Sequence, residues 1–122
     1  MATEWSTFAE FCPSRTVLDC IAEKWVALVL GRLAQRPHRF NELRRDVGGI
    51  SQKMLSQTLK SLERKGLVTR RAFATVPVTV EYSITPLGQT LANVLDQVRG
   101  WAETNIEQVE AAERAYDDRV TE

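Results

Sequence analysis

A run of basic and amide side chains recurs at helical spacing between Ser51 and Lys65. At about 100° per residue, they gather on one side of a helix as a basic stripe of Lys53, Gln57, Lys60 and Arg64. The opposite side collects Leu55, Thr58, Leu59 and Leu62. A helix fits the DNA major groove, where lysine reaches guanine acceptors, glutamine pairs with adenine and basic side chains neutralise phosphates. The stripe therefore indicates contact with duplex DNA, although a solvated amphipathic helix has the same pattern.

Other kinds of chemistry find little support in the sequence. An enzyme needs a nucleophile, a base and a pocket, yet His38 is the only histidine and stands in an expected loop. There is no glycine-rich phosphate cradle. The two cysteines, Cys12 and Cys20, are too few for a disulfide scaffold or a metal-ligand set. We therefore expect no catalytic activity, no metal and no cofactor.

Charge is distributed unevenly along this chain, whose formal net charge is zero. From Arg36 to Arg71 ten basic residues stand against three acidic ones, and from Asp96 onward eight acidic residues stand against three basic ones. The zero total does not favour nucleic-acid binding. The asymmetry, however, suggests a basic central surface that meets a polyanion and an acidic end turned away from it. Two solvated faces are the alternative explanation.

Helical periodicity predicts the elements that position the basic stripe. A helix over Ser14–Ile21 follows Pro13, and a second helix over Trp25–Leu33 is expected to be largely buried through its apolar residues. These apolar residues are Trp25, Leu28, Val29 and Leu33. A short third helix carries Phe40, Leu43 and Val47 on one face.

A tight turn is expected between the third helix and the basic stripe. Gly48 and Gly49 end the third helix because glycine tolerates positive φ. Ser51 is a good N-cap for the next helix, which Gly66 ends. Two helices joined in this way predict a helix-turn-helix.

After Gly66 the apolar pattern changes to a period of two, which predicts two strands. They cover residues 67–73 and 78–84 and are joined by a short link that contains Pro77. Arg70 and Arg71 stand at the base of this hairpin, or wing. The wing is suited to lie along the phosphate backbone or to send its tip into the minor groove. An edge hairpin with unremarkable charges is the alternative.

Thr85-Pro86 predicts the start of a last helix that continues almost to Tyr116. Some 30 residues at 1.5 Å each extend roughly 45 Å, which exceeds the width of a small domain. Its distal apolar residues therefore need another surface, and a second copy related by a twofold axis is the simplest cover. Two such copies would read half-sites about one helical turn apart.

The whole chain is expected to form one domain of 122 residues, mainly α with a small β-hairpin. The predicted architecture is a winged helix-turn-helix with the helix-turn-helix at about 40–65, the wing at about 67–84 and a dimerisation helix at about 86–117. No apolar run is long enough to span a bilayer, and the N-terminus lacks a basic region followed by an apolar run. We expect a cytoplasmic protein that does not bind membranes.

Several short motifs occur in the order of the HxlR-type winged-helix transcriptional regulators, relatives of the MarR group, and the chain resembles that family from about Cys12 to Trp101. The motifs are Cys12-Pro13, Lys24-Trp25, Arg39-Phe40-Asn41-Glu42-Leu43-Arg44-Arg45, Gly49-Ile50-Ser51-Gln52-Lys53-Met54-Leu55 and Val80-Glu81-Tyr82-Ser83-Ile84-Thr85-Pro86-Leu87-Gly88. The resemblance implies a homodimer built from the terminal helices that binds a near-palindromic operator in double-stranded DNA.

Residues that face DNA in the family map onto the fourth helix and the wing of this chain. With the basic positions noted above, the expected DNA-binding residues are Ser51, Gln52, Lys53, Ser56, Gln57, Lys60, Arg64, Arg70, Arg71, Thr75 and Thr79. The expected dimerisation residues are Val17, Val94, Val98, Trp101, Ile106 and Val109. The family commonly carries an arginine just before the Val80-Glu81-Tyr82 run, where this chain has Thr79. Insertion of that side chain into the minor groove is not carried over.

Cys12 is a candidate redox-sensing residue, because sensors of oxidants and electrophiles in the family often place a cysteine beside proline near the first helix. A thiol at a helix N-terminus feels the positive end of the helix dipole, which favours the reactive thiolate. Two copies of Cys12 in a dimer would form a disulfide if their Cα atoms came within about 7 Å. A packed apolar thiol is the alternative for Cys12 and the main interpretation for Cys20.

Two further functions stay open alongside a redox-responsive repressor. One is a regulator that responds to a small-molecule effector bound in an apolar cavity near Trp25 and Trp101, although both tryptophans are expected in the core. The other is a winged-helix module that binds proteins and not DNA, since a fold does not fix a function.

Overall fold

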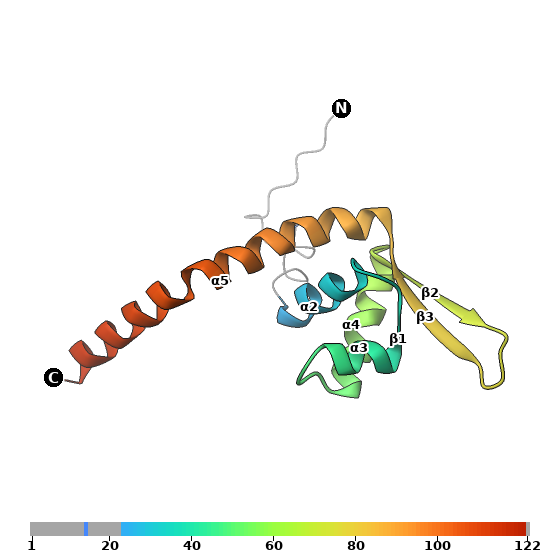
Figure 1. Ribbon diagram of the computed structural model, residues 1–122, viewed down its shortest axis with the longest axis horizontal. Helices are drawn as coiled ribbons and strands as arrows, with labels where there is room; N and C mark the ends of the chain where they lie inside the picture. Colours follow the sequence, from blue (N-terminus) through green and yellow to red (C-terminus); the bar gives the residue numbers. More distant parts are fainter. Residues whose placement is uncertain (1–13, 15–22, 122) are drawn as a thin grey trace, which may run out of the picture.

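The computed structural model describes Ser14 and residues 23–121. Within this part, the elements follow in an order that matches a winged helix-turn-helix (Figure 1). The helices are α2 (Lys24–Leu33), α3 (Phe40–Asp46), α4 (Gln52–Arg64) and α5 (Pro86–Val120), and the strands are β1 (His38–Arg39), β2 (Val68–Phe73) and β3 (Thr79–Ile84). The mainly helical fold class is confirmed, while the predicted helix at Ser14–Ile21 lies outside the described residues except for Ser14.

The hydrophobic core lies where α2, α3 and α4 meet the base of the sheet and the start of α5. Leu30 and Leu33 of α2, Leu43 of α3, and Leu55 and Leu62 of α4 are all buried in it. The predicted packing side of α4 is confirmed, because all four of its residues are buried. Burial of this face removes apolar surface from water and fixes the orientation of the opposite, basic side.

The predicted packing face of α2 was partly wrong. Val29 and Leu33 are buried as expected, but Leu28 is 41% exposed, and Val26 and Leu30 fill the core beside them. The buried face is therefore rotated toward Val26 and Leu30, which lie four residues apart on one side of the helix. Because α2 carries apolar residues around most of its circumference, periodicity alone did not select the correct side.

Local capping fixes the turn before α4. Gly49 has a φ of 85°, which non-glycine residues rarely adopt, and it allows the chain to reverse after α3. The Ser51 hydroxyl oxygen then accepts a hydrogen bond from the Met54 backbone N–H at 3.0 Å. The predicted N-cap is thus confirmed, and it places the first turn of α4 at the surface.

The sheet contains one more strand than the sequence indicated, in the order β1-β3-β2 with antiparallel neighbours. The strand β1 pairs His38 with Tyr82 and Arg39 with Glu81. The expectation that His38 lies in a loop was wrong: it is a strand residue with only 1% of its surface exposed. A strand of two residues has no periodicity to detect, which explains why it was missed.

The wing is the hairpin of β2 and β3, and it extends beyond the core (Figure 1). Its observed strands begin one residue later than the predicted ranges, and the two strands pair from Val68 opposite Ile84 to Phe73 opposite Thr79. Pro77 lies in the connecting loop, as predicted.

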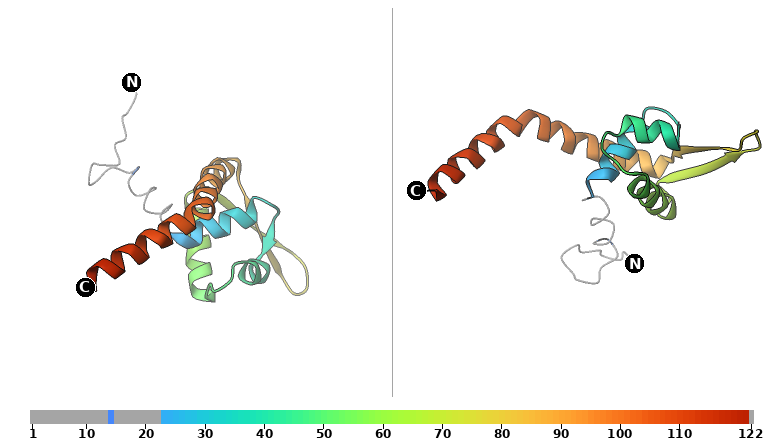
Figure 2. Two further views of the ribbon diagram at one scale, coloured as in Figure 1. Left: turned by 60° about the vertical axis from the view of Figure 1, so that its left-hand side comes forward. Right: turned by 90° about the horizontal axis from the view of Figure 1, so that it is seen from below.

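The helix α5 begins at the predicted cap and runs to Val120, about three residues beyond the predicted end near residue 117. The Thr85 hydroxyl accepts a hydrogen bond from the Gly88 N–H at 3.0 Å and donates one to the Gly66 carbonyl oxygen at 2.7 Å. The first turns of α5 pack on the core through Ala92 and Leu95. The remainder extends away from the domain, as both further views show (Figure 2). None of the described helices is both long and apolar enough to cross a membrane.

Candidate DNA-binding surface

The basic stripe of α4 lies on the exposed side of the helix. Lys53, Gln57, Lys60 and Arg64 are all exposed, and no described acidic residue forms an ion pair with the three cations. The buried leucines on the other side hold the helix in place. This arrangement presents uncompensated positive charge and one amide on a fixed helix, which suits contacts to phosphates and to base edges.

The serines and glutamine at the start of α4 contribute differently to this surface. Gln52 and Ser51 are exposed, whereas Ser56 is half-buried. The Ser51 oxygen already accepts the capping hydrogen bond from Met54, so its hydroxyl is left with a proton to donate. A hydroxyl donor at this position suits a phosphate oxygen better than a base donor.

The two wing arginines point to opposite faces of the hairpin, since adjacent residues of a strand alternate. Arg70 pairs with Tyr82, which packs against the core, so Arg70 lies on the core side of the ribbon. Arg71 pairs with Glu81 on the other side, and its guanidinium carbon lies 4.9 Å from the centre of the Phe73 ring. The Arg70 and Arg71 side chains therefore point in different directions.

The threonines at the wing tip contact each other. The Thr75 and Thr79 hydroxyl oxygens lie 3.1 Å apart, and the Thr75 hydroxyl also lies 2.8 Å from the Pro77 carbonyl oxygen, to which it can donate. These contacts brace the loop between β2 and β3. The tip therefore carries no charged side chain, and Val76 and Val78 are exposed beside the two threonines.

The distal part of α5 exposes the apolar residues that were expected to join two subunits. Val94, Val98 and Trp101 recur at intervals of four and three residues, so they lie on one face, and Trp101 is 62% exposed. Ile106 and Val109 are exposed farther along the helix. The expectation that Trp101 belongs to the core was wrong for the single chain. Val17 and Cys12 lie outside the described residues.

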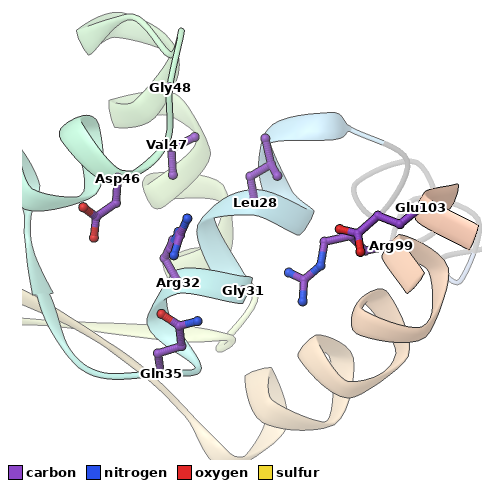
Figure 3. Close-up of a pocket in the computed structure, with 9 residues that line it drawn as sticks. All are labelled: Leu28, Gly31, Arg32, Gln35, Asp46, Val47, Gly48, Arg99 and Glu103. Atoms are coloured by element: carbon purple, nitrogen blue, oxygen red, sulfur yellow. The ribbon is translucent and has the colours of Figure 1, made fainter. Parts of the chain in front are cut away.

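The pockets do not match the apolar cavity expected near Trp25 and Trp101. Trp25 is half-buried and lines a pocket of about 370 Å³ with Met54 and Gln57. A different pocket, of about 390 Å³, lies between α2, the turn after α3 and α5 (Figure 3). Arg32 of α2, Gln35 just after α2, and Arg99 and Glu103 of α5 all line it, so much of its lining is polar and charged.

A third pocket brings together residues that the sequence analysis did not include in the site. This groove, of about 770 Å³, separates the start of α3 from the strand β3 and includes Arg39 and Arg45. Both arginines belong to the basic segment between residues 36 and 71, but only the strand β1 brings them beside the wing. The excess of basic residues was the available signal, and it did not identify which arginines lie together.

Comparison with known proteins identifies relatives over most of the chain. The model of the HxlR-like helix-turn-helix family matches residues 20–110. The HTH-type transcriptional regulator YtfH of Escherichia coli is 45% identical over 106 residues, which cover 87% of this chain and 84% of the relative. The solved structure of the transcriptional regulator ytfH from Salmonella typhimurium has a TM-score of 0.85 at 43% identity and covers 91% of this chain and 99% of its own.

A second solved relative is the redox regulator HypR, known in two forms. Its reduced form is 37% identical with a TM-score of 0.74 and covers 81% of this chain and 98% of its own. Its oxidised form is 39% identical with a TM-score of 0.71 and covers 77% and 97% of the two chains.

Proposed function

Since this chain belongs to the HxlR-like helix-turn-helix family of transcriptional regulators, we propose that it represses transcription as a homodimer that reads a near-palindromic operator with α4. The observation that carries the proposal is the exposed basic stripe of α4, which is capped by Ser51, backed by buried leucines and free of ion pairs with the described residues. Residues of the stripe contact bases and phosphates in the major groove, while the wing contacts the backbone beside it.

The geometry of α5 supports the homodimer. Its 35 residues extend roughly 50 Å at 1.5 Å per residue, and only the first turns pack on the core of the same chain. The apolar row of Val94, Val98 and Trp101, followed by Ile106 and Val109, is left uncovered. Because an isologous interface uses the same patch on both subunits, a second copy of α5 covers it, together with Val17 near the N-terminus.

The single-domain organisation is part of the proposal. The helix-turn-helix, the wing and the first turns of α5 share one core, and the distal part of α5 serves only as the dimerisation element. Such a protein needs no catalytic residue, metal or cofactor to bind DNA.

DNA binding is tested by fluorescence anisotropy with the purified protein and a duplex selected from a random library. For contacts to phosphates, the logarithm of affinity falls linearly with the logarithm of salt concentration, by about 0.9 per phosphate. Lys53→Ala, Lys60→Ala and Arg70→Ala should each flatten this slope by about one. Gln57→Ala should instead reduce the preference for the selected sequence by about 1–3 kcal/mol.

Arg114→Ala is the matched control for these variants, because Arg114 is exposed near the end of α5, far from α4. It should leave both the slope and the sequence preference unchanged. A wild-type protein whose affinity for every duplex is weak and independent of salt would instead support the module that binds proteins.

A response to oxidants through Cys12 is the second part of the proposal. The specific support is the similarity to HypR, a redox regulator whose structure is known in reduced and oxidised forms. Oxidation of the Cys12 thiol to a disulfide with the second copy would change the geometry of the dimer and hence its operator affinity.

Cys12→Ser tests this part, with Cys20→Ser as the control at the other thiol. Under peroxide or quinone, wild type and Cys20→Ser should change their operator affinity, whereas Cys12→Ser should not. If Cys12→Ser responds to the oxidant like wild type, Cys12 is not the sensor. If wild type itself does not respond, the redox function is excluded and regulation by a small-molecule effector becomes the better explanation.

A further inference from the structure

We propose that a second basic surface, formed by Arg39 of β1 and by Arg44 and Arg45 of α3, binds DNA backbone phosphates beside the sequence that α4 reads. This inference rests on the proposed DNA-binding function and extends the contact surface from α4 across α3 to the wing. It predicts a sequence-independent contribution to affinity from residues that the basic stripe does not include.

The two acidic residues of α3 have partners within the domain. One carboxylate oxygen of Glu42 accepts the Arg39 backbone N–H at 2.9 Å, and the other lies 3.3 Å from the Arg36 guanidinium. The Asp46 carboxylate lies 3.0 Å from the buried ring of His38. Both acids of the helix are therefore occupied by internal partners, and Arg36 is the only arginine of this region that they neutralise among the described residues.

The remaining three arginines are exposed and without acidic partners. Arg39, Arg44 and Arg45 form no ion pair with any described residue. On an ordinary solvated helix, Glu42 would be well placed to pair with Arg45, three residues later. Here Glu42 instead contacts Arg36 and the Arg39 backbone N–H, so Arg44 and Arg45 of α3 are exposed and form no ion pair with a described residue.

A groove next to these arginines connects them to the wing. Arg39 and Arg45 line it together with Glu42, and the segment from Val78 to Glu81 also lines it. Thr79 lies in that segment and contacts Thr75 at the wing tip. Arg39 and Arg45 thus border the same hairpin that the proposed function places on the DNA backbone. In Figure 1, α3 lies on the side of the domain opposite α5, and the tip of the wing points away from α5.

Arginine is well suited to this role. Its guanidinium presents donors in a planar fork that can bind two oxygens of one phosphate. Contacts to phosphates position a protein on the duplex and carry no sequence information. The expected signature is therefore a loss of affinity that is equal on all sequences and that depends on salt.

The test measures salt slopes for Arg39→Gln, Arg45→Gln and the double variant on two duplexes, the selected operator and an unrelated sequence of equal length. Each single variant should flatten the slope by about 0.9, and the double variant by about twice that. The ratio of the two affinities should stay the same. Arg45→Lys should keep the slope of wild type, because it keeps the charge.

Arg114→Gln, on the distal part of α5, is the matched control and should behave like wild type. A thermal melt verifies that each variant is folded. Arg45 is exposed and has no described partner, so Arg45→Gln tests the surface even if Arg39→Gln disturbs the strand β1.

Three results would overturn the inference. The first is a double variant whose salt slope equals that of wild type. The second is a loss of affinity for the operator without a loss for the unrelated duplex, which would indicate contacts to bases. The third is tight binding of inorganic phosphate by the wild type with no change in DNA slope in the variants, which would assign the groove to a small anion. If Lys53→Ala and Lys60→Ala flatten the slope while the arginine variants do not, only this inference fails; if none of them does, the proposed function fails as well.

Discussion

The Nε2 atom of His38 lies 3.0 Å from the Asp46 carboxylate, and this contact joins the strand β1 to the end of α3. The other ring nitrogen, Nδ1, lies 2.8 Å from the Arg36 carbonyl oxygen. Each ring nitrogen therefore lies within hydrogen-bond distance of an oxygen acceptor. The only histidine of the chain is thus a structural residue that holds the first helix of the helix-turn-helix against the sheet.

His38→Leu should lower the free energy of unfolding by about 1–3 kcal/mol, because it removes the partly buried polar contacts of His38 with Asp46 and with the Arg36 carbonyl oxygen. Asp46→Asn should lower the free energy of unfolding by less, because the Asp46 side chain is partly exposed and the oxygen of the new amide can still accept a hydrogen bond from Nε2. Urea unfolding followed by circular dichroism measures both values. Equal stability of wild type and His38→Leu would show that these contacts contribute nothing net.

Glu42 makes stability depend on pH in the acidic range. Its pKa lies below the ordinary value of 4.5, chiefly because the carboxylate accepts the Arg39 N–H and also because the Arg36 charge is near. Since folding lowers this pKa, the ionised carboxylate stabilises the fold above pH 4.5, and that contribution is lost as the pH falls through the folded-state value.

The stability difference between wild type and Glu42→Gln should therefore be largest at neutral pH and shrink below pH 4.5. Urea unfolding at a series of pH values measures this difference. Glu63→Gln is the control, because Glu63 is exposed on α4 and forms no ion pair with a described residue. A difference for Glu42→Gln that stays constant with pH contradicts the prediction.

Gly88 allows the first turn of α5 to approach the chain after α4. A Cβ atom at this position would lie 2.1 Å from the Leu67 carbonyl oxygen and 2.8 Å from the Ile84 side chain. Gly88→Ala should therefore destabilise the fold by about 1–3 kcal/mol or more, as overpacking of a tight contact does. A calorimetric melt measures the effect.

Gly100→Ala is the matched control on the same helix, because no atom lies within 4 Å of the position of its Cβ. It should raise stability by about 0.5–1 kcal/mol, since alanine loses less conformational freedom than glycine in a helix. Equal effects of the two substitutions would show that the contact with Leu67 is not tight in solution.

The apolar row on α5 predicts that a charged side chain introduced into it weakens the dimer. Val98→Lys and Trp101→Lys place an ammonium group in the expected interface and should shift the protein to the mass of a single chain. Sedimentation analysis measures the mass. Ala111→Lys adds the same charge on the opposite side of α5 and should leave the dimer intact. If Val98→Lys stays dimeric, α5 does not form the interface through this row.

The sequence predicted those parts of the fold in which one pattern extends over many residues. The alternation of leucines and polar residues in α4 located the buried and exposed sides correctly, and Ser51 and Thr85 marked the helix starts through their hydroxyl groups. The strand β1 escaped detection because its two residues gain their structure from pairing with β3, which lies more than 40 residues later in the chain. The position of Leu28 and the exposure of Trp101 also depend on tertiary packing.

The candidate site was predicted unevenly for the same reason. Side chains on one helix share a face by spacing alone, so the basic stripe followed from the sequence. Arg70 and Arg71 were expected to act together at the base of the wing. Strand alternation instead places their side chains on two different faces of the hairpin. The second basic surface depends on Glu42 and Asp46 turning to Arg36 and His38, and no spacing rule specifies those partners.

The Thr85 side chain has a consequence for how the two halves of a dimer are spaced. Its single oxygen caps α5 and also reaches the Gly66 carbonyl directly after α4, so the end of one helix and the start of the other are held a few ångströms apart. In the proposed homodimer, any change in the angle between the two α5 helices is therefore passed on to the α4 helices without an intervening flexible linker. In that homodimer, the contact between Thr85 and Gly66 would help to set the distance between the two α4 helices.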